Sequence, residues 1–176
     1  MIAQGIETVP IMLELQRQPE LWNENRARTT YETSPHSETS DIWARWHDEN
    51  TLDDNKSHEL KFLSAWYKLP SLRPVVFALM ARCSAVQLGA VLITKIPAGK
   101  RVWPHNDSGG WHSEWFNTKV YMVLQGNVDC VNFAEEESVV MNTGTAWVFN
   151  NRVIHGVNNG GIDDRISLIV CLRCES

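Results

Sequence analysis

The sequence predicts a mainly β protein with flanking helices, whose β core is an antiparallel sandwich or barrel. Short runs rich in β-branched residues follow one another after Gly89, among them VLITKI, VYMVL, AWVFN and ISLIVCL. Turn-forming segments such as PAGK, QGN and NNGGIDD separate these runs at even spacing. We therefore expect a single domain in which residues 1–88 are helix-rich and pack against a β core formed by residues 89–176.

Helices are predicted ahead of this core. One is expected within residues 11–28, and a polar, turn-forming loop follows over residues 29–41. Residues 56–69 carry apolar side chains at helical spacing, and Pro70 is expected to end that helix. Pro74 suits the first turn of a further helix, because a proline there loses no intrahelical hydrogen bond.

Composition excludes several classes of protein. The 176 residues carry a formal net charge of −5 and contain no run of lysine and arginine, so no strong nucleic-acid binding is expected. The N-terminus lacks the basic and apolar regions of a signal peptide, and no apolar run is long enough to span a membrane. We expect a cytoplasmic protein with no membrane partner. Its substrate is a small molecule, a peptide or a protein, and the sequence predicts no particular oligomeric state.

The four cysteines are Cys83, Cys130, Cys171 and Cys174. Only the last two lie close together, in the segment CLRC, whereas a structural zinc site needs two such pairs or a matching pair of histidines. We interpret CLRC as part of the last strand, with reduced thiols as in other cytoplasmic proteins.

A candidate metal site consists of His105, Asp107 and His155. In an extended segment His105 and Asp107 project to the same face, and His155 follows fifty residues later behind the run AWVFN. Two imidazoles and one carboxylate leave coordination positions open, which suits iron(II) that must bind a cosubstrate and dioxygen. The alternative is that His105 is an ordinary loop histidine and His155 an ordinary strand histidine.

Arg165 opens the run ISLIVCL, ten residues after His155. A charged residue at the head of a strand can simply be solvated. In the functional interpretation its planar guanidinium reaches into the barrel and binds a carboxylate through two hydrogen bonds. A dicarboxylate cosubstrate such as 2-oxoglutarate needs such a partner, so the metal triad and Arg165 together favour an oxygenase.

Three segments, VLITKIPAGKRVWPHND, TAWVFNNRVIHGVNN and RISLIVCL, resemble the aspartyl/asparaginyl β-hydroxylase family of 2-oxoglutarate-dependent oxygenases. The resemblance covers about residues 90–173. It implies a double-stranded β-helix (a jelly roll, cupin-like) and a dioxygenase that uses iron(II), 2-oxoglutarate and O2. It further implies hydroxylation of a C–H bond with release of succinate and CO2. By the same resemblance Thr94 helps to hold the cosubstrate, together with Lys119 or Tyr121.

The sequence departs from this family in two places. Asp107 supplies an acidic metal ligand that the best-known animal members lack, which favours iron binding but puts their substrate in doubt. The segment from Asp107 to Lys119 is longer than the family pattern, and His112 and Trp115 are candidate pocket-lining residues there, although His112 also fits an ordinary loop histidine. The earlier segment SDIWARW resembles an element of bacterial and phage relatives, and its Arg45 either faces the site or forms a structural ion pair.

Two rival functions agree with parts of the sequence. A cupin-type metalloenzyme without an organic cosubstrate would keep the metal triad but would have no use for Arg165. A non-catalytic jelly-roll binding or structural module would bind no metal at stoichiometric levels. Metal content and a response to 2-oxoglutarate therefore separate the three functions.

Overall fold

A computed structural model describes residues 1–47, 59–107 and 111–175. Most of its helices are short and lie in the N-terminal half. They are α1 (Val9–Arg17), a 3-10 turn at Pro19–Leu21, α2 (Ala27–Thr30), α3 (Ser64–Lys68), α4 (Leu72–Arg82) and α5 (Trp111–Trp115). Prolines mark the boundaries: one opens α1, another starts the 3-10 turn, and Pro74 lies in the first turn of α4, as predicted.

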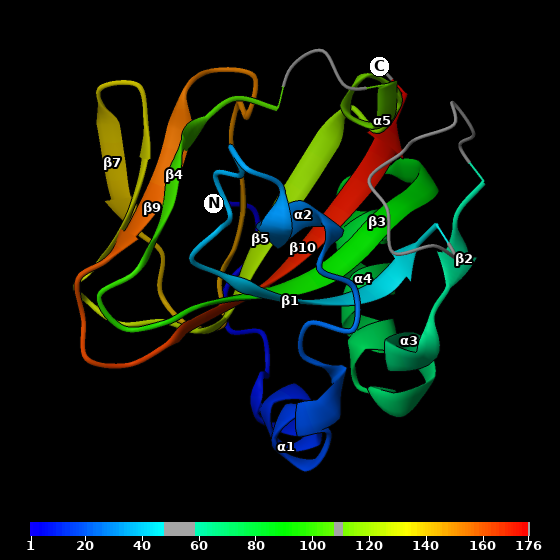
Figure 1. Cartoon of the computed structure of the whole chain (residues 1–176). Coiled ribbons are helices and arrows are strands. Elements are labelled where there is room, and N and C mark those ends of the chain that lie inside the picture. Colours follow the sequence, from blue (N-terminus) through cyan, green and yellow to red (C-terminus); the bar gives the residue numbers. More distant parts are fainter. Residues whose placement is uncertain (48–58, 108–110, 176) are drawn as a thin grey trace.

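The strands form two antiparallel sheets. They are β1 (Ser40–Trp46), β2 (Lys61–Phe62), β3 (Ala85–Ile96), β4 (Arg101–His105), β5 (Thr118–Gln125), β6 (Cys130–Ala134), β7 (Glu137–Val140), β8 (Ala146–Val148), β9 (His155–Asn159) and β10 (Arg165–Cys174). Within the described residues the larger sheet has the order β2-β1-β3-β10-β5-β8 and the smaller one β4-β9-β6-β7. Figure 1 shows the small sheet on one side of the large sheet, and α1, α3 and α4 on the other.

Side-chain alternation along β10 gives the two faces of the large sheet different roles. One set of its residues packs into the core beneath α1, α3 and α4, and the other set faces the interior between the sheets. The first set is Ile166, Leu168, Val170 and Leu172, and the second is Arg165, Ser167, Ile169 and Cys171. The side chains of β10 that face the interior include the polar residues Arg165 and Ser167, and these line a cavity between the sheets.

This architecture is the predicted one: mainly β with flanking helices, in the form of a jelly roll. The short β-branched runs after Gly89 all lie in strands or at their ends. The segment CLRC lies within the last ten-residue strand, as predicted, and all four cysteines are free thiols. Among the helices that the structure describes, none has the length and apolar character needed to cross a bilayer.

The N-terminal half differs from prediction in two respects. Residues 40–46 form β1, which pairs with β3 and extends the large sheet, although no strand was predicted there. The helix predicted over residues 56–69 is only the five-residue α3, preceded by the short strand β2, and residues 56–58 lie outside the described residues. In both places pairing with a neighbouring strand overrides the local pattern.

Candidate metal centre

The two histidines of the predicted metal site face each other across neighbouring strands. His105 ends β4 and His155 begins β9, and the two residues are direct partners in the antiparallel register. Their ring centroids are 4.4 Å apart. Side chains of directly opposed residues lie on the same face of a sheet, so strand pairing alone brings these imidazoles together from fifty residues apart.

Backbone hydrogen bonds orient both rings. Nδ1 of His105 donates to the carbonyl of Trp103 at 2.8 Å, and Nδ1 of His155 donates to the carbonyl of Val153 at 3.0 Å. A carbonyl can only accept, so each Nδ1 carries the proton and each Nε2 presents a lone pair. Such an outer hydrogen bond is the usual support of a metal-binding histidine.

The carboxylate of Asp107 completes the cluster just beyond the end of β4. Its oxygens lie 3.6 Å from Nε2 of His105 and 3.9 Å from Nε2 of His155. One ligand atom from each of the three residues falls within 4.8 Å of the others, close enough to hold a single metal ion. Two nitrogen donors and one oxygen donor on one side of a metal suit iron(II) with open positions better than a closed structural zinc site.

Lys119 and Asn151 hold the Asp107 carboxylate in place. Both contact the same oxygen, Lys119 through its ammonium group and Asn151 through its amide at 2.8 Å. Burial alone would raise the pKa of Asp107, but the charge and hydrogen bond of Lys119 and the hydrogen bond from Asn151 together lower this pKa to about 2. The carboxylate is therefore ionised and oriented before any metal binds.

Arg165 points into the interior and is only 2% exposed. Its Nε donates to the hydroxyl of Ser167 at 2.9 Å, and Nη1 lies 3.5 Å from the sulfur of Cys130. Within the described residues no carboxylate forms an ion pair with this guanidinium, and burial lowers its pKa. A buried cation without a counter-ion is costly unless a ligand supplies the negative charge.

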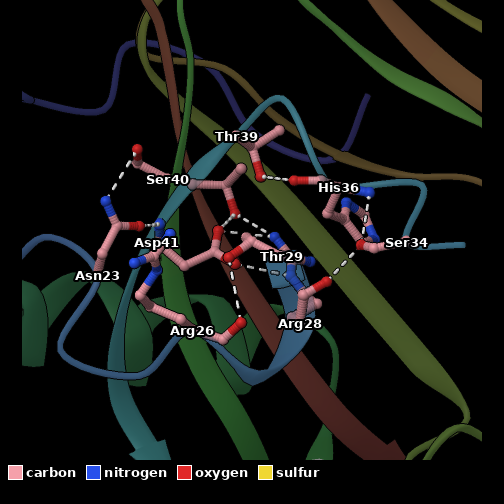
Figure 2. Close-up of polar contacts among 10 residues, drawn as sticks. Asn23, Arg26, Arg28, Thr29, Ser34, His36, Thr39, Ser40 and Asp41 are labelled. Atoms are coloured by element: carbon pink, nitrogen blue, oxygen red, sulfur yellow. Dashed lines mark hydrogen bonds and ion pairs between the residues drawn. The ribbon is translucent and has the colours of Figure 1, made fainter. Parts of the chain in front are cut away.

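The segment of residues 23–39, which contains the short helix α2 and leads into β1, brings a second arginine to the same cavity (Figure 2). Arg28 of α2 makes a bidentate ion pair with Asp41, through Nε at 2.9 Å and Nη2 at 2.8 Å. Nη2 also donates to the hydroxyl of Thr94 at 2.7 Å, and this hydroxyl donates to Asp41 at 2.9 Å. Asp41 and Thr94 are cross-strand partners in β1 and β3, so the large sheet itself anchors Arg28.

Replacing Asp41 with alanine is expected to destabilise the protein by about 3–5 kcal/mol, because it leaves the guanidinium of Arg28, whose side chain is only 15% exposed, without its counter-ion. Asp41 itself is 0% exposed, so its carboxylate is a fully desolvated partner of this pair. Urea denaturation of the variant measures the loss, and Asp129→Ala, at an exposed position, serves as the control with a change below about 0.5 kcal/mol. A loss below about 1 kcal/mol for Asp41→Ala would mean that this pair does not stabilise the fold.

The structure brings the remaining candidate cosubstrate residues to the same cavity. Thr94, Lys119 and Tyr121 all line it with the metal cluster and Arg165. Lys119 and Tyr121 are two residues apart in β5 and share its inner face, which is why the sequence could not separate them. Tyr121 stacks on Phe149 with 4.7 Å between ring centroids. Burial raises the pKa of Tyr121, so its hydroxyl remains protonated.

The other candidates lie in different positions. His112 lies in α5 and not in a loop, and it lines a neighbouring cavity with its ring against Trp46 and Phe116. Trp115 hydrogen-bonds Gln87 and packs under the guanidinium of Arg173, and residues 108–110 of this segment lie outside the described residues.

Arg45 of β1 contacts the backbone of the neighbouring strand β3. A bulge in β1 between Trp43 and Arg45 interrupts the alternation of side chains. Nη1 of Arg45 donates hydrogen bonds to the carbonyls of Leu88 and Gly89. This contact is structural but is not the ion pair considered from the sequence.

Sequence reasoning missed several residues of the cavity. Ser167 could have been predicted from the sequence, because it follows Arg165 by two residues in the same strand and its side chain therefore projects from the same face. Arg28 and His36 carried no such signal, because the short helix α2 and the irregular turns after it bring them to the cavity. Phe149 and Asn132 likewise line the cavity from positions that no motif marked.

Fold and cluster together define a jelly-roll protein with two histidines and one aspartate in metal-binding geometry between its sheets. The chain belongs to the aspartyl/asparaginyl β-hydroxylase family, whose model matches residues 14–173. The match extends well beyond the resemblance found from the sequence, into the N-terminal helices. This is a family of 2-oxoglutarate-dependent hydroxylases. No curated protein sequence matches the chain.

Solved structures offer distant similarities. One is a predicted oxalate decarboxylase from Thermotoga maritima, with 15% identity, a TM-score of 0.43, and coverage of 77% of this chain and 81% of that one. Another is a cupin domain from Bordetella pertussis, with 16% identity, a TM-score of 0.39, and coverage of 50% and 84%. A cupin superfamily protein from Desulfitobacterium hafniense has 15% identity, a TM-score of 0.37, and coverage of 48% and 67%. At these identities the similarity concerns the fold alone.

Proposed function

We propose that the protein is an iron(II)- and 2-oxoglutarate-dependent oxygenase that hydroxylates a C–H bond and releases succinate and CO2. One observation carries the proposal: the His105–Asp107–His155 cluster shares a cavity with the buried, uncompensated cation Arg165. A metal site alone does not require a buried arginine, and an arginine alone does not require a metal. A cosubstrate that chelates iron(II) and carries a second carboxylate requires both.

Each residue of the cavity has a defined task in this proposal. His105, Asp107 and His155 would hold iron(II), which when bound supplies dioxygen activation coupled to the oxidative decarboxylation of 2-oxoglutarate. Arg165, oriented by Ser167, would bind the far carboxylate of the cosubstrate through two charge-assisted hydrogen bonds. Tyr121 keeps its proton and can donate a further hydrogen bond. Lys119 balances the charge of Asp107 and keeps it oriented.

Thr94 has a more restricted task than the family resemblance implies. Its single hydroxyl proton is given to Asp41, while a guanidinium hydrogen of Arg28 occupies a lone pair. Thr94 can therefore donate to the cosubstrate only by releasing Asp41. We assign it mainly to the anchoring of Arg28.

The proposal is tested with purified protein loaded with iron(II). Anaerobic addition of 2-oxoglutarate is expected to produce a visible charge-transfer absorption, and admission of O2 is expected to release succinate. A protein that binds iron without any response to 2-oxoglutarate would be a cupin-type enzyme of another kind. A protein that binds no iron at stoichiometric levels would be a binding or structural module. Either result would overturn the proposed function.

A further inference from the structure

A second cavity adjoins the metal centre. We call it the aromatic cavity, because its lining includes aromatic and apolar side chains: Trp43, Trp46, Ala90, Leu92, His112 and Phe116. The rings pack in sequence: Trp43 on Trp46, Trp46 on His112 and His112 on Phe116, with centroid distances of 4.6–4.8 Å. The side chains supplied by β1 and β3 lie on the inner face of the large sheet, next to the row that carries Thr94 and Ser167.

The two cavities meet at a shared boundary. Arg28, His36, Asp107, Lys119 and Ile169 line both of them. The cavity on the metal side has a volume of about 60 Å³, whereas the aromatic cavity has about 320 Å³, which is within the range of small-molecule sites. With iron(II) and 2-oxoglutarate on the metal side, a bulky group of the substrate has room in the aromatic cavity, with its near end at the boundary beside Asp107.

Arg28 can bind an anion at this boundary. Asp41 and Thr94 engage its Nε and Nη2, and the described residues give its Nη1 no hydrogen-bond partner. The ion pair with Asp41 fixes the plane of the guanidinium, so Nη1 is positioned before a ligand arrives. Asp107 is the only carboxylate among the described residues that line the aromatic cavity, and the proposed iron(II) engages it.

The charges of the two cavities leave room for one further anion. The cations Arg28, Lys119 and Arg165 stand against the carboxylates Asp41 and Asp107, with the imidazoles counted as neutral. One positive charge remains, and an iron(II) ion and a 2-oxoglutarate dianion cancel each other. A substrate with a single negative charge makes the loaded site neutral, which matters because unbalanced charge is costly in a buried site.

We propose that the substrate is a small monocarboxylic acid with an aromatic or bulky apolar group. Its carboxylate binds Nη1 of Arg28 and its apolar group fills the aromatic cavity. This inference rests on the proposed function and names the substrate of the same site. In the reaction one atom of O2 enters a C–H bond of the acid, close to its carboxylate. The other atom enters succinate as 2-oxoglutarate loses CO2, so no further reductant is needed.

The experiment uses protein loaded with manganese(II) and 2-oxoglutarate, which occupies the metal site without turnover. Isothermal titration calorimetry compares 3-phenylpropionate with 3-phenylpropan-1-ol, which has the same ring but no charge, and with L-aspartate. The acid is expected to bind at least about tenfold more tightly than the alcohol, because it forms a charge-assisted hydrogen bond with Arg28. L-aspartate, which has no apolar group, is expected to bind more weakly than both.

Two variants test separately the contact of the carboxylate with Arg28 and the contact of the apolar group with the aromatic cavity. The double variant Arg28→Gln/Asp41→Asn removes the ion pair without leaving a lone charge, and it should reduce the preference for acid over alcohol to less than about twofold. Ala90→Leu fills part of the aromatic cavity and should weaken both ligands about tenfold or more. Tyr67→Ala, at an exposed position of α3, is the control that changes neither. With iron(II) and O2, 3-phenylpropionate should increase succinate release and yield a hydroxylated acid.

The outcomes distinguish this inference from the function on which it rests. If the protein binds 2-oxoglutarate but does not prefer the acid to the alcohol, the substrate class is wrong and the oxygenase assignment stands. The same holds if L-aspartate or an aspartate-containing peptide binds more tightly and increases turnover. If the protein does not bind 2-oxoglutarate at all, both proposals fail.

Discussion

Replacing His155 with alanine is expected to abolish stoichiometric iron binding and succinate formation together. The proposed site has only three protein ligands, and the described residues place no other histidine, cysteine or acidic side chain in the cluster to replace a lost one. Loss of an outer hydrogen-bond partner alone typically costs a metal site 10–100-fold in affinity, so loss of a direct ligand should cost more than about 100-fold. His105→Ala and Asp107→Ala should behave in the same way.

A graded variant distinguishes loss of the ligand from loss of its orientation. Asn151 donates to Asp107 at 2.8 Å without belonging to the cluster. Asn151→Ala should therefore weaken iron binding by about tenfold and leave measurable succinate formation. Iron content per chain after gel filtration and succinate release measure the two effects, with Arg17→Gln on the exposed side of α1 as a control. Full iron occupancy in all three ligand variants would contradict the assignment of the cluster.

The sequence predicted the elements of the site that depend on regular structure. His105 ends a strand and Asp107 follows two residues later, so alternation predicts that these two side chains project to the same face. Arg165 begins another strand, and its inward direction was a hypothesis based on its chemistry. Strand patterns also predicted the β core correctly, because turn-forming residues separate its short runs.

The sequence could not predict which residues of the N-terminal segment reach the cavity, or that β1 joins the large sheet. Arg28 lies in the short helix α2 and His36 in the turns after it, and side-chain to backbone hydrogen bonds such as those of Ser34 and Thr39 set the shape of this segment (Figure 2). These residue types are common in polar loops of any shape, so they carry no directional signal. The strand β1 was missed for a related reason: its pairing with β3 bridges a long interval of sequence, and no local pattern records such a contact.

Lys119 illustrates an intermediate case. Its place in β5 was known from the strand pattern, but its contact with Asp107 depends on how the end of β4 approaches the large sheet. The sequence therefore placed Lys119 near the site without showing that it orients a metal ligand.

Replacing Arg165 with methionine is expected to weaken 2-oxoglutarate binding by about 100-fold, because two charge-assisted hydrogen bonds to the far carboxylate contribute about 3 kcal/mol together. Arg165→Lys keeps the charge but loses the planar fork, so it should weaken binding by about tenfold. Affinity for iron(II) in the absence of 2-oxoglutarate should change less than twofold in both variants, because Arg165 has no contact with the cluster. Titration of the charge-transfer absorption with 2-oxoglutarate measures the affinities.

The same methionine variant is expected to have an unchanged or higher free energy of unfolding in the absence of ligands. Arg165 is buried, its hydrogen bonds go to Ser167 and Cys130, and no described carboxylate balances its charge. An apolar side chain of similar length avoids that desolvation cost. A structural arginine would give the opposite result, a large loss of stability with no specific effect on 2-oxoglutarate. Lower affinity combined with undiminished stability therefore identifies Arg165 as a residue retained for its ligand, because the unliganded fold gains nothing from a buried, unbalanced charge.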